Sequence, residues 1–292
     1  MNNAKYRKKN GVIGIIYLVL IFVFLFAPIA VLIYFSFNSG KSTAVMDGFS
    51  LRWYRELFRD EMTLGALRNT VVLAITSTVI STIVGTAAAY GISRMKKRYI
   101  KSLVMNATNI PLMNPDIITG ISLMLLFVFA GTLIGLDPIL SFRTLLTAHI
   151  TFSLPYVVLS VLPKFGQMDR SLPEAALDLG CTPVQSFFRV ELPEILPGVF
   201  TGAIMAFTMS LDDFVISYFT KGSDFQTLPI LIYSMTKKTV TPKIYALATI
   251  IFFTILFLLI LSNLISTKDE RKHINRLKKQ RKIKIKKGEN LN

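Results

Sequence analysis

Three carboxylates interrupt stretches of the sequence that are otherwise apolar. Asp116 follows a run from Asn109 to Pro115 that holds two prolines and two asparagines, and Asp212 and Asp213 are adjacent near the end of a later apolar segment. A carboxylate in hydrocarbon is costly, so acids in such segments usually face an aqueous path or a partner. Carboxylates pair with ammonium groups, and the faces of aromatic rings also attract ammonium groups. Three aromatic residues follow Asp212 and Asp213 in the sequence, at Tyr218, Phe219 and Tyr233. These residue types predict a path for a small cation.

The two adjacent acids belong to different faces of one predicted helix. Small residues recur at four-residue spacing, which permits close helix contact, at Gly198, Gly202, Ala206 and Ser210. Asp213 continues this small-residue stripe, whereas Asp212 continues a neighbouring, more polar one formed with Thr201, Met205 and Thr208. We therefore expect Asp212 to face the path and Asp213 to lie at a helix interface. The alternative is that one or both acids only cap the outer end of the helix bundle.

The elements that carry these acids are long apolar segments. More than half of the residues are hydrophobic and the mean hydropathy is positive, which is typical of a membrane protein. Segments of this length predict an all-α polytopic membrane protein with six transmembrane helices. The predicted spans are Gly11 to Phe37, Asn69 to Ile92, Ser102 to Leu136, Phe142 to Leu162, Ile195 to Ser217 and Ile244 to Ser266. Pro111 and Pro115 should break or kink the third.

Basic residues predict the orientation of the spans. The amino-terminal segment 1–10, the turn from Arg94 to Lys101 with five basic and no acidic residues, and the tail 267–292 fall on one side if six spans alternate. Positive charge favours the cytoplasmic side, so both termini are expected there. The transmembrane domain is then 11–266. The net charge of +16 follows mainly from this arrangement, so no nucleic-acid partner is expected. The basic tail is instead expected to be solvated or to associate with anionic lipid.

The sequence lacks the clustered reactive residues that an enzyme would need. Cys181 is the only cysteine, and His149 and His273 are isolated from each other and from any cysteine. Neither metal ligation nor a nucleophile with its base is supported, so no catalytic residue, metal or cofactor is expected. His149 is expected to form hydrogen bonds between helices.

A polar segment at 171–193 separates the fourth and fifth spans. Ser171 and Glu174 are spaced as a capping box, and Thr182, Pro183 and Gln185 can start a second helix. Gly180 between them suits a left-handed residue at a helix end. The second helix carries an apolar face of Val184, Phe187 and Phe188, which indicates a partner protein with a groove. The alternative is an ordinary packed loop on the same side as the basic turn.

This hairpin resembles the EAA loop of ABC-importer permeases. The motif of that family is Glu-Ala-Ala, then a glycine, a phenylalanine, an isoleucine and a Leu-Pro pair at fixed spacing. The matching positions are Glu174, Ala175, Ala176, Gly180, Phe187, Val190, Leu192 and Pro193, and only Val190 departs from it. The resemblance implies that the hairpin is a coupling helix lodged in a groove of an ATPase subunit, and that the fold is that of a type I ABC-importer permease.

Other stretches resemble the PotC-type permeases of spermidine/putrescine importers. They lie at 114–123, 149–158, 207–215 and 228–235. The resemblance implies polyamine import, with Asp116 and Asp212 on the substrate path. It also implies four kinds of partner in the bacterial cytoplasmic membrane: the lipid bilayer, a cytoplasmic ABC ATPase dimer, a second permease of PotB type and an extracytoplasmic polyamine-binding protein.

Two other classes of function are weighed against an ABC permease. A self-contained secondary transporter would use Asp116 and Asp212 as sites for a coupling ion, and an inverted internal repeat would favour it. No such repeat is evident in the sequence. A membrane-bound enzyme would need a cluster of reactive residues, and the sequence holds none. ATP hydrolysis is expected in a separate subunit.

Overall fold

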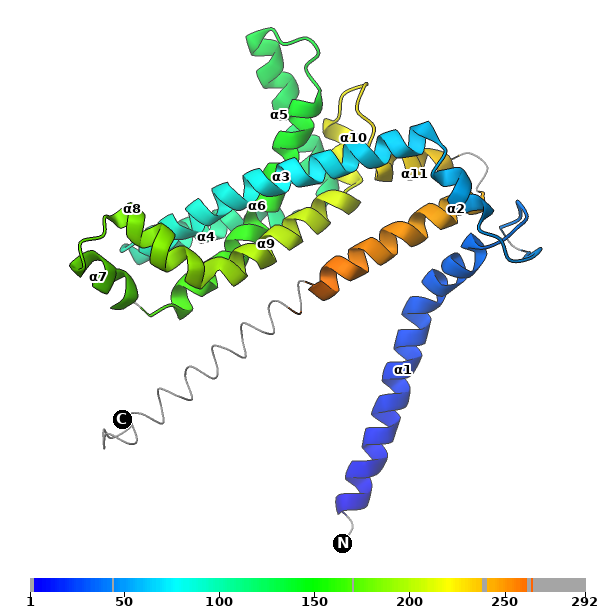
Figure 1. The fold of residues 1–292 in the computed structure, drawn as a ribbon, viewed down its shortest axis with the longest axis horizontal. Coiled ribbons are helices and arrows are strands. Elements are labelled where there is room, and N and C mark those ends of the chain that lie inside the picture. The colour runs from blue at the N-terminus through cyan, green and yellow to red at the C-terminus, as the bar shows by residue number, and fades with distance from the viewer. Residues whose placement is uncertain (1–2, 44, 170, 238–240, 262–263, 265–292) are drawn as a thin grey trace. The chain divides into compact units, whose positions relative to one another are not determined.

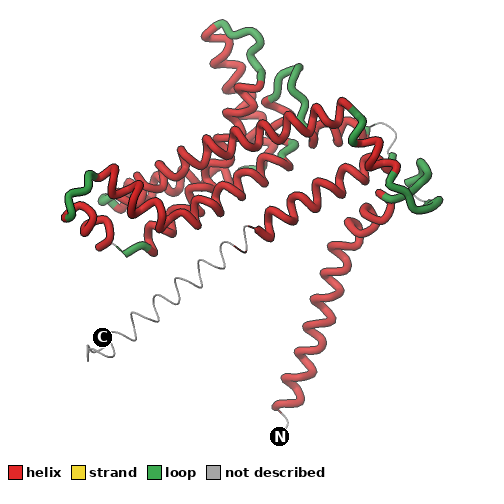
Figure 2. The backbone as a smooth tube through the Cα atoms, in the orientation of Figure 1, coloured by secondary structure: helices red, strands yellow, loops and turns green. Residues whose placement is uncertain are grey.

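A computed structural model describes residues 3–43, 45–169, 171–237, 241–261 and 264. The described chain consists of helices and loops (Figures 1 and 2). The helices are α1 (Asn3–Ser36), α2 (Arg52–Leu57), α3 (Glu61–Arg94), α4 (Arg98–Met113), α5 (Asp116–Ile134), α6 (Phe142–Gln167), α7 (Ser171–Asp178), α8 (Pro183–Ser186), the π-helical turn η1 (Phe187–Glu191), α9 (Leu192–Asp212), α10 (Val215–Thr220) and α11 (Leu228–Thr236). A last helix covers Pro242–Leu261.

Six helices of the described chain are long and apolar enough to cross a membrane. They are Gly14–Ser36, Glu61–Arg94, Asp116–Ile134, Phe142–Gln167, Pro183–Asp212 and Pro242–Leu261. This confirms the all-α, six-span prediction. The basic residues 3–10 belong to the same helix as the first span. The end of the sixth predicted span and the basic tail 267–292 lie outside the described residues.

Two predicted spans are not single helices. The third, predicted from Ser102 to Leu136, consists of α4 and α5, and only α5 is both long and apolar enough to count as a span. Asn114 and Pro115 separate them in extended backbone, with ψ of 140° and 136°, because a residue before proline avoids the helical region. In Figure 1, α5 leaves the direction of α4 at this break. The fifth span was predicted to reach Ser217, but α9 ends at Asp212 and Asp213 is extended.

The chain forms two compact units, the first of which contains residues 1–64 and 232–254. Its loop after α1 is held by Asn38, which is fully buried. The Asn38 side chain donates to the carbonyls of Ser42 and Val45, and its backbone oxygen accepts from Trp53 Nε1 at 2.7 Å. Asp60, which lies just before α3 and outside the spans, is 2.7 Å from Lys243, and this hydrogen bond holds the pKa of Asp60 below its usual value.

Of the described residues, the second unit contains those from 65 to 231 and from 255 to 264, and its centre is the contact between α6 and α9. The small-residue stripe of α9 is buried, as the sequence predicted. A β-carbon at Gly198 would lie 2.8 Å from the Ser160 carbonyl, and one at Gly202 would lie 3.1 Å from Val157 Cα, so the glycines permit this approach. Apolar side chains of α3, α6 and α9 complete the core at Ala89, Ile92, Val157, Val158, Val161, Phe165, Ile195 and Ala206.

Candidate functional site

Asp116 is placed by the break in the third span. It is the first residue of α5, where the unpaired amides of a helix start favour a negative charge. Its side chain is exposed in the described chain. One turn later, Gly120 packs so closely on Phe219 that a β-carbon would lie 3.0 Å from the ring. The break therefore presents a carboxylate one turn before the contact between α5 and α10.

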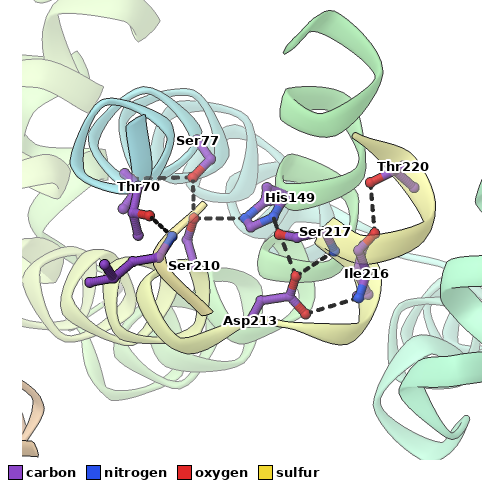
Figure 3. Close-up of polar contacts among 10 residues, drawn as sticks. Thr70, Ser77, His149, Ser210, Asp213, Ile216, Ser217 and Thr220 are labelled. Atoms are coloured by element: carbon purple, nitrogen blue, oxygen red, sulfur yellow. Dashed lines mark hydrogen bonds and ion pairs between the residues drawn. The ribbon is translucent and has the colours of Figure 1, made fainter. Parts of the chain in front are cut away.

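Asp212 and Asp213 lie in different environments although they are adjacent. Asp212 ends α9 and is exposed, whereas the side chain of Asp213 is only 8% exposed. The Asp213 carboxylate accepts hydrogen bonds from the amides of Ile216 at 3.2 Å and Ser217 at 2.7 Å (Figure 3). It thus caps the start of α10 and holds the break between the two helices.

His149 links Asp213 to the rest of the unit. The imidazole is fully buried, with Nδ1 2.7 Å from Ser210 Oγ and Nε2 2.9 Å from Ser217 Oγ. Nε2 also lies 3.5 Å from the Asp213 carboxylate, and Ser77 Oγ bonds Ser210 Oγ at 3.1 Å (Figure 3). The predicted interhelical role of His149 is confirmed: this polar cluster ties α3, α6, α9 and α10 together.

Tyr156 of α6 lies near enough to the two exposed acids for their charges to act on it, and the sequence prediction missed it. Asp116 and Asp212 interact electrostatically with each other and with the half-buried Tyr156. Its spacing from His149 could have indicated it. Tyr156 lies seven residues after His149, which is about two helical turns and places both residues on the same face of the helix. The ring of Tyr218 contacts that of Phe214 at a tilt of 40°, with the centroids 5.6 Å apart.

The segment 171–193 forms the predicted hairpin of two short helices at one end of α3, α6 and α9 (Figure 1). Gly180 has φ of +83°, the left-handed conformation expected of it. Thr182 and Gln185 form a capping box at α8, with Pro183 in its first turn. The start of α7 differs from the prediction: Ser171 is the first residue of the helix and not its cap, and its amide donates to the Asp169 carboxylate at 3.0 Å. Bonds from Ser171 hold the pKa of Asp169 below its usual value.

The apolar face of the hairpin is smaller than the sequence indicated. Val184 and Phe188 are 66% and 60% exposed, and Leu179 adds to them at 86%. Phe187 was assigned to the same face, but it packs inward with its ring centroid 5.0 Å from that of Tyr90. A π-helical turn begins at Phe187, so Phe187 and the residues after it do not continue the α-helical register of Val184.

The remaining motif residues divide between the surface and the interior of the hairpin. Glu174, Ala175 and Pro193 are exposed, Leu192 is half-buried, and Ala176 is buried.

Glu191 is a second residue that sequence reasoning missed. It ends the π-helical turn and is 2% exposed. Its Oε1 accepts a hydrogen bond from Arg94 at 2.6 Å, and the Arg94 guanidinium also lies 5.3 Å above the ring of Tyr90. The pair joins the base of the hairpin to the end of α3. No local sequence pattern indicates that Glu191 forms this pair, because Arg94 lies 97 residues away.

Comparison with known proteins identifies the family. The model for "Binding-protein-dependent transport system inner membrane component" matches residues 77–271, which is more than half of the chain. The chain belongs to this family. It is therefore a multi-span permease component of the inner membrane and not an enzyme, and nothing in the comparisons supports a self-contained secondary transporter.

Curated relatives cover most of the chain. It is 40% identical over 237 residues to the putrescine transport system permease protein PotI of Escherichia coli (strain K12), with 81% of this chain and 84% of that protein covered. It is 36% identical over 253 residues to the spermidine/putrescine transport system permease protein PotC of Haemophilus influenzae, with 87% and 96% covered.

Among solved structures, a bacterial ABC transporter involved in the import of the acidic polysaccharide alginate matches with a TM-score of 0.67. The match has 13% identity and covers 88% of this chain and 96% of that chain. A structure of the alginate transporter in complex with its pentasaccharide-bound periplasmic protein matches with a TM-score of 0.66, at 17% identity and with 94% and 99% covered. At these identities the likeness concerns the fold.

Proposed function

We propose that this chain is a permease subunit of an ATP-driven importer and forms part of a membrane path for polyamines such as putrescine and spermidine. The observation that carries the proposal is the grouping of Asp116 and Asp212, each at the break of a span, with Tyr156 of α6. The names of the permeases to which it is 36–40% identical support polyamines as the substrate class.

The chemistry of the group suits a flexible organic cation. A primary ammonium group loses part of its hydration inside a membrane protein, and a carboxylate offsets that loss with a charge-assisted hydrogen bond. Asp116 and Asp212 are exposed in the single chain and can therefore meet a ligand, while Tyr156 offers a hydroxyl and an aromatic face. Asp213 is committed to Ser217 and His149. We assign it a structural role.

Coupling to ATP hydrolysis belongs to the hairpin in this proposal. Leu179, Val184 and Phe188 present an exposed apolar surface beside the exposed Glu174 and Ala175, and an ATPase dimer would bind there. Gly180 sets the angle between α7 and α8, and Phe187, Leu192 and Pro193 connect the hairpin to α9.

The complete transporter would contain further subunits. We propose a second, PotB-type permease, two copies of the ATPase and an extracytoplasmic polyamine-binding protein, in a bacterial membrane with both termini of this chain in the cytoplasm. ATP-driven movement of the hairpins would alternate the access of the path. The permease domain would be 11–266, flanked by the basic segments 1–10 and 267–292.

The test removes one charge at a time from the assembled transporter. Asp116→Asn and Asp212→Asn conserve shape, and each should lower the kcat/KM of labelled putrescine or spermidine uptake about tenfold or more, while the amount of purified complex is unchanged. Asp224→Asn is the matched control, because Asp224 is an exposed acid whose hydrogen bond among the described residues comes from its neighbour Ser223.

Asp213→Asn should act differently and reduce the yield and stability of the complex. Wild-type uptake by both Asp116→Asn and Asp212→Asn would remove these residues from the path and refute the proposed site.

A further inference from the structure

A cavity of about 730 Å³ lies between the hairpin and the helices above it. Its walls come from the end of α3, the connection to α4, the end of α6, the hairpin and η1. Two candidate spans end here and a third begins here, so the cavity lies at a membrane surface. The transport path proposed above does not use it.

Two buried polar atoms in the cavity wall need a partner. Glu191 Oε2 and Ser186 Oγ are both buried, and each lacks a hydrogen-bond partner among the described residues. Both residues are 2% exposed and both line the cavity. A buried carboxylate oxygen without a donor is costly, and native proteins nearly always satisfy such a group. An occupant of this cavity should therefore carry hydrogen-bond donors.

The charges on the wall indicate an anion as well. Arg94 is paired with Glu191, but Lys96 and Lys101 also line the cavity and have no described carboxylate partner. The one other acid in the wall is Glu174, so the lining carries three basic and two acidic side chains. An occupant with a single negative charge would balance this lining.

The surroundings also suit an apolar group. Leu162, Phe165 and Met168 form part of the wall. Tyr99 and Leu103 of α4, on either side of Lys101, are 75% and 50% exposed. Acyl chains can lie along such a surface at the boundary between headgroups and hydrocarbon.

We propose that this cavity binds the headgroup of an anionic phospholipid that carries free hydroxyls, such as phosphatidylglycerol. The phosphodiester would lie between Lys96 and Lys101, and the headgroup hydroxyls would donate to Glu191 Oε2 and bond Ser186 Oγ. An amine headgroup suits the site less, because its ammonium would face three basic side chains. A phosphate ester without hydroxyls would leave Glu191 unsatisfied.

Bound lipid would join the base of the hairpin to the end of α3. The lipid site requires only that the cavity lies at a membrane surface, in either leaflet. If the experiments refute the lipid site, the proposed transport function is therefore unaffected.

The first experiment measures lipid retention by the purified complex in mixed micelles of phosphatidylglycerol and phosphatidylcholine, with mass spectrometry of the retained lipid. The wild type should retain phosphatidylglycerol selectively. Lys96→Gln with Lys101→Gln should lower its affinity about 30-fold, since each lysine near an anionic lipid surface contributes about fivefold. Lys97→Gln with Arg98→Gln is the control, because it removes equal charge from the same turn at residues outside the cavity. Equal losses from both double variants would overturn the site.

The second experiment identifies the headgroup. Phosphatidylmethanol has the same charge without hydroxyls and should bind several-fold more weakly than phosphatidylglycerol. Glu191→Gln should reduce the difference in affinity between the two lipids, because a glutamine amide is neutral and depends less than a carboxylate on donors from the headgroup hydroxyls. Soluble glycerophosphoglycerol should compete only weakly. Equal affinity for the two lipids would refute the hydroxyl contacts, and competition by the soluble diester at lipid-like concentrations would refute a lipid as the occupant.

Discussion

Asp212 and Asp213 show how backbone geometry separates two identical side chains. Both would follow one helical register if α9 continued, but the helix ends at Asp212 and Asp213 adopts ψ of 120°. The Asp213 carboxylate then turns to the amides at the start of α10 and to His149, while Asp212 stays exposed. One acid is used to build the break, and the other is left available for a ligand.

The polar cluster around His149 should be a main source of stability for this break. His149→Leu would leave Ser210 and Ser217 without their imidazole partner, and the buried Asp213 carboxylate would lose the ring nitrogen that lies 3.5 Å from it. Leaving a buried polar group without its partner costs about 1–3 kcal/mol. We expect a loss of that size in the free energy of unfolding, measured by denaturation in mixed micelles.

Thr151→Val is the control for this substitution. Thr151 lies on the same helix, is exposed, and bonds only the Thr147 carbonyl one turn earlier. Its change should be within about 0.5 kcal/mol. If His149→Leu were as mild as the control, the cluster would not hold the break.

At the scale of helices and turns, the features that the sequence predicted correctly are those that depend on neighbouring residues in the chain. Hydropathy and length located all six spans, and the break at Asn114 followed from the proline after it. The left-handed turn at Gly180 and the cap at Thr182 were likewise local.

The missed features depend on residues far away in the sequence. The break at Asp213 has neither proline nor glycine, and it is held by His149, which lies 64 residues earlier. The inward turn of Phe187 depends on Tyr90, and the burial of Glu191 depends on Arg94. Asp116 and Asp212 were recognised separately, but only the packing of α5, α6 and α9 brings them together with Tyr156, which the sequence prediction missed.

The hairpin as an element should tolerate little change at its turn. Gly180→Val places a β-branched residue at φ of +83°, which costs about 1–3 kcal/mol and should alter the angle between α7 and α8. We expect substrate-stimulated ATP hydrolysis and uptake by the reconstituted transporter to fall several-fold, with normal membrane insertion. Gly91→Ala, in open space on α3, should keep both activities. Wild-type coupling in Gly180→Val would refute the role of this turn.

At the scale of the whole molecule, charge and hydropathy support one topology. The basic turn from Arg94 to Lys101 follows the second span, and the hairpin follows the fourth. An even number of spans separates each of them from the amino terminus, so the hairpin shares a side with the basic turn. Positive charge favours the cytoplasm for that side, which is where an ATPase can reach the hairpin.

Cysteine labelling in intact cells tests this topology directly. The lone Cys181 is first replaced by serine, which removes the background thiol. Lys41 and Lys97 are both exposed and lie one span apart, since only Glu61–Arg94 separates them. A membrane-impermeant maleimide should therefore label Lys41→Cys in intact cells and Lys97→Cys only after the membrane is opened. Each variant must keep wild-type uptake, so that labelling reports on the assembled transporter. Labelling of both positions in intact cells would mean that Glu61–Arg94 does not cross the membrane, and the cytoplasmic placement of the hairpin would then fail with it.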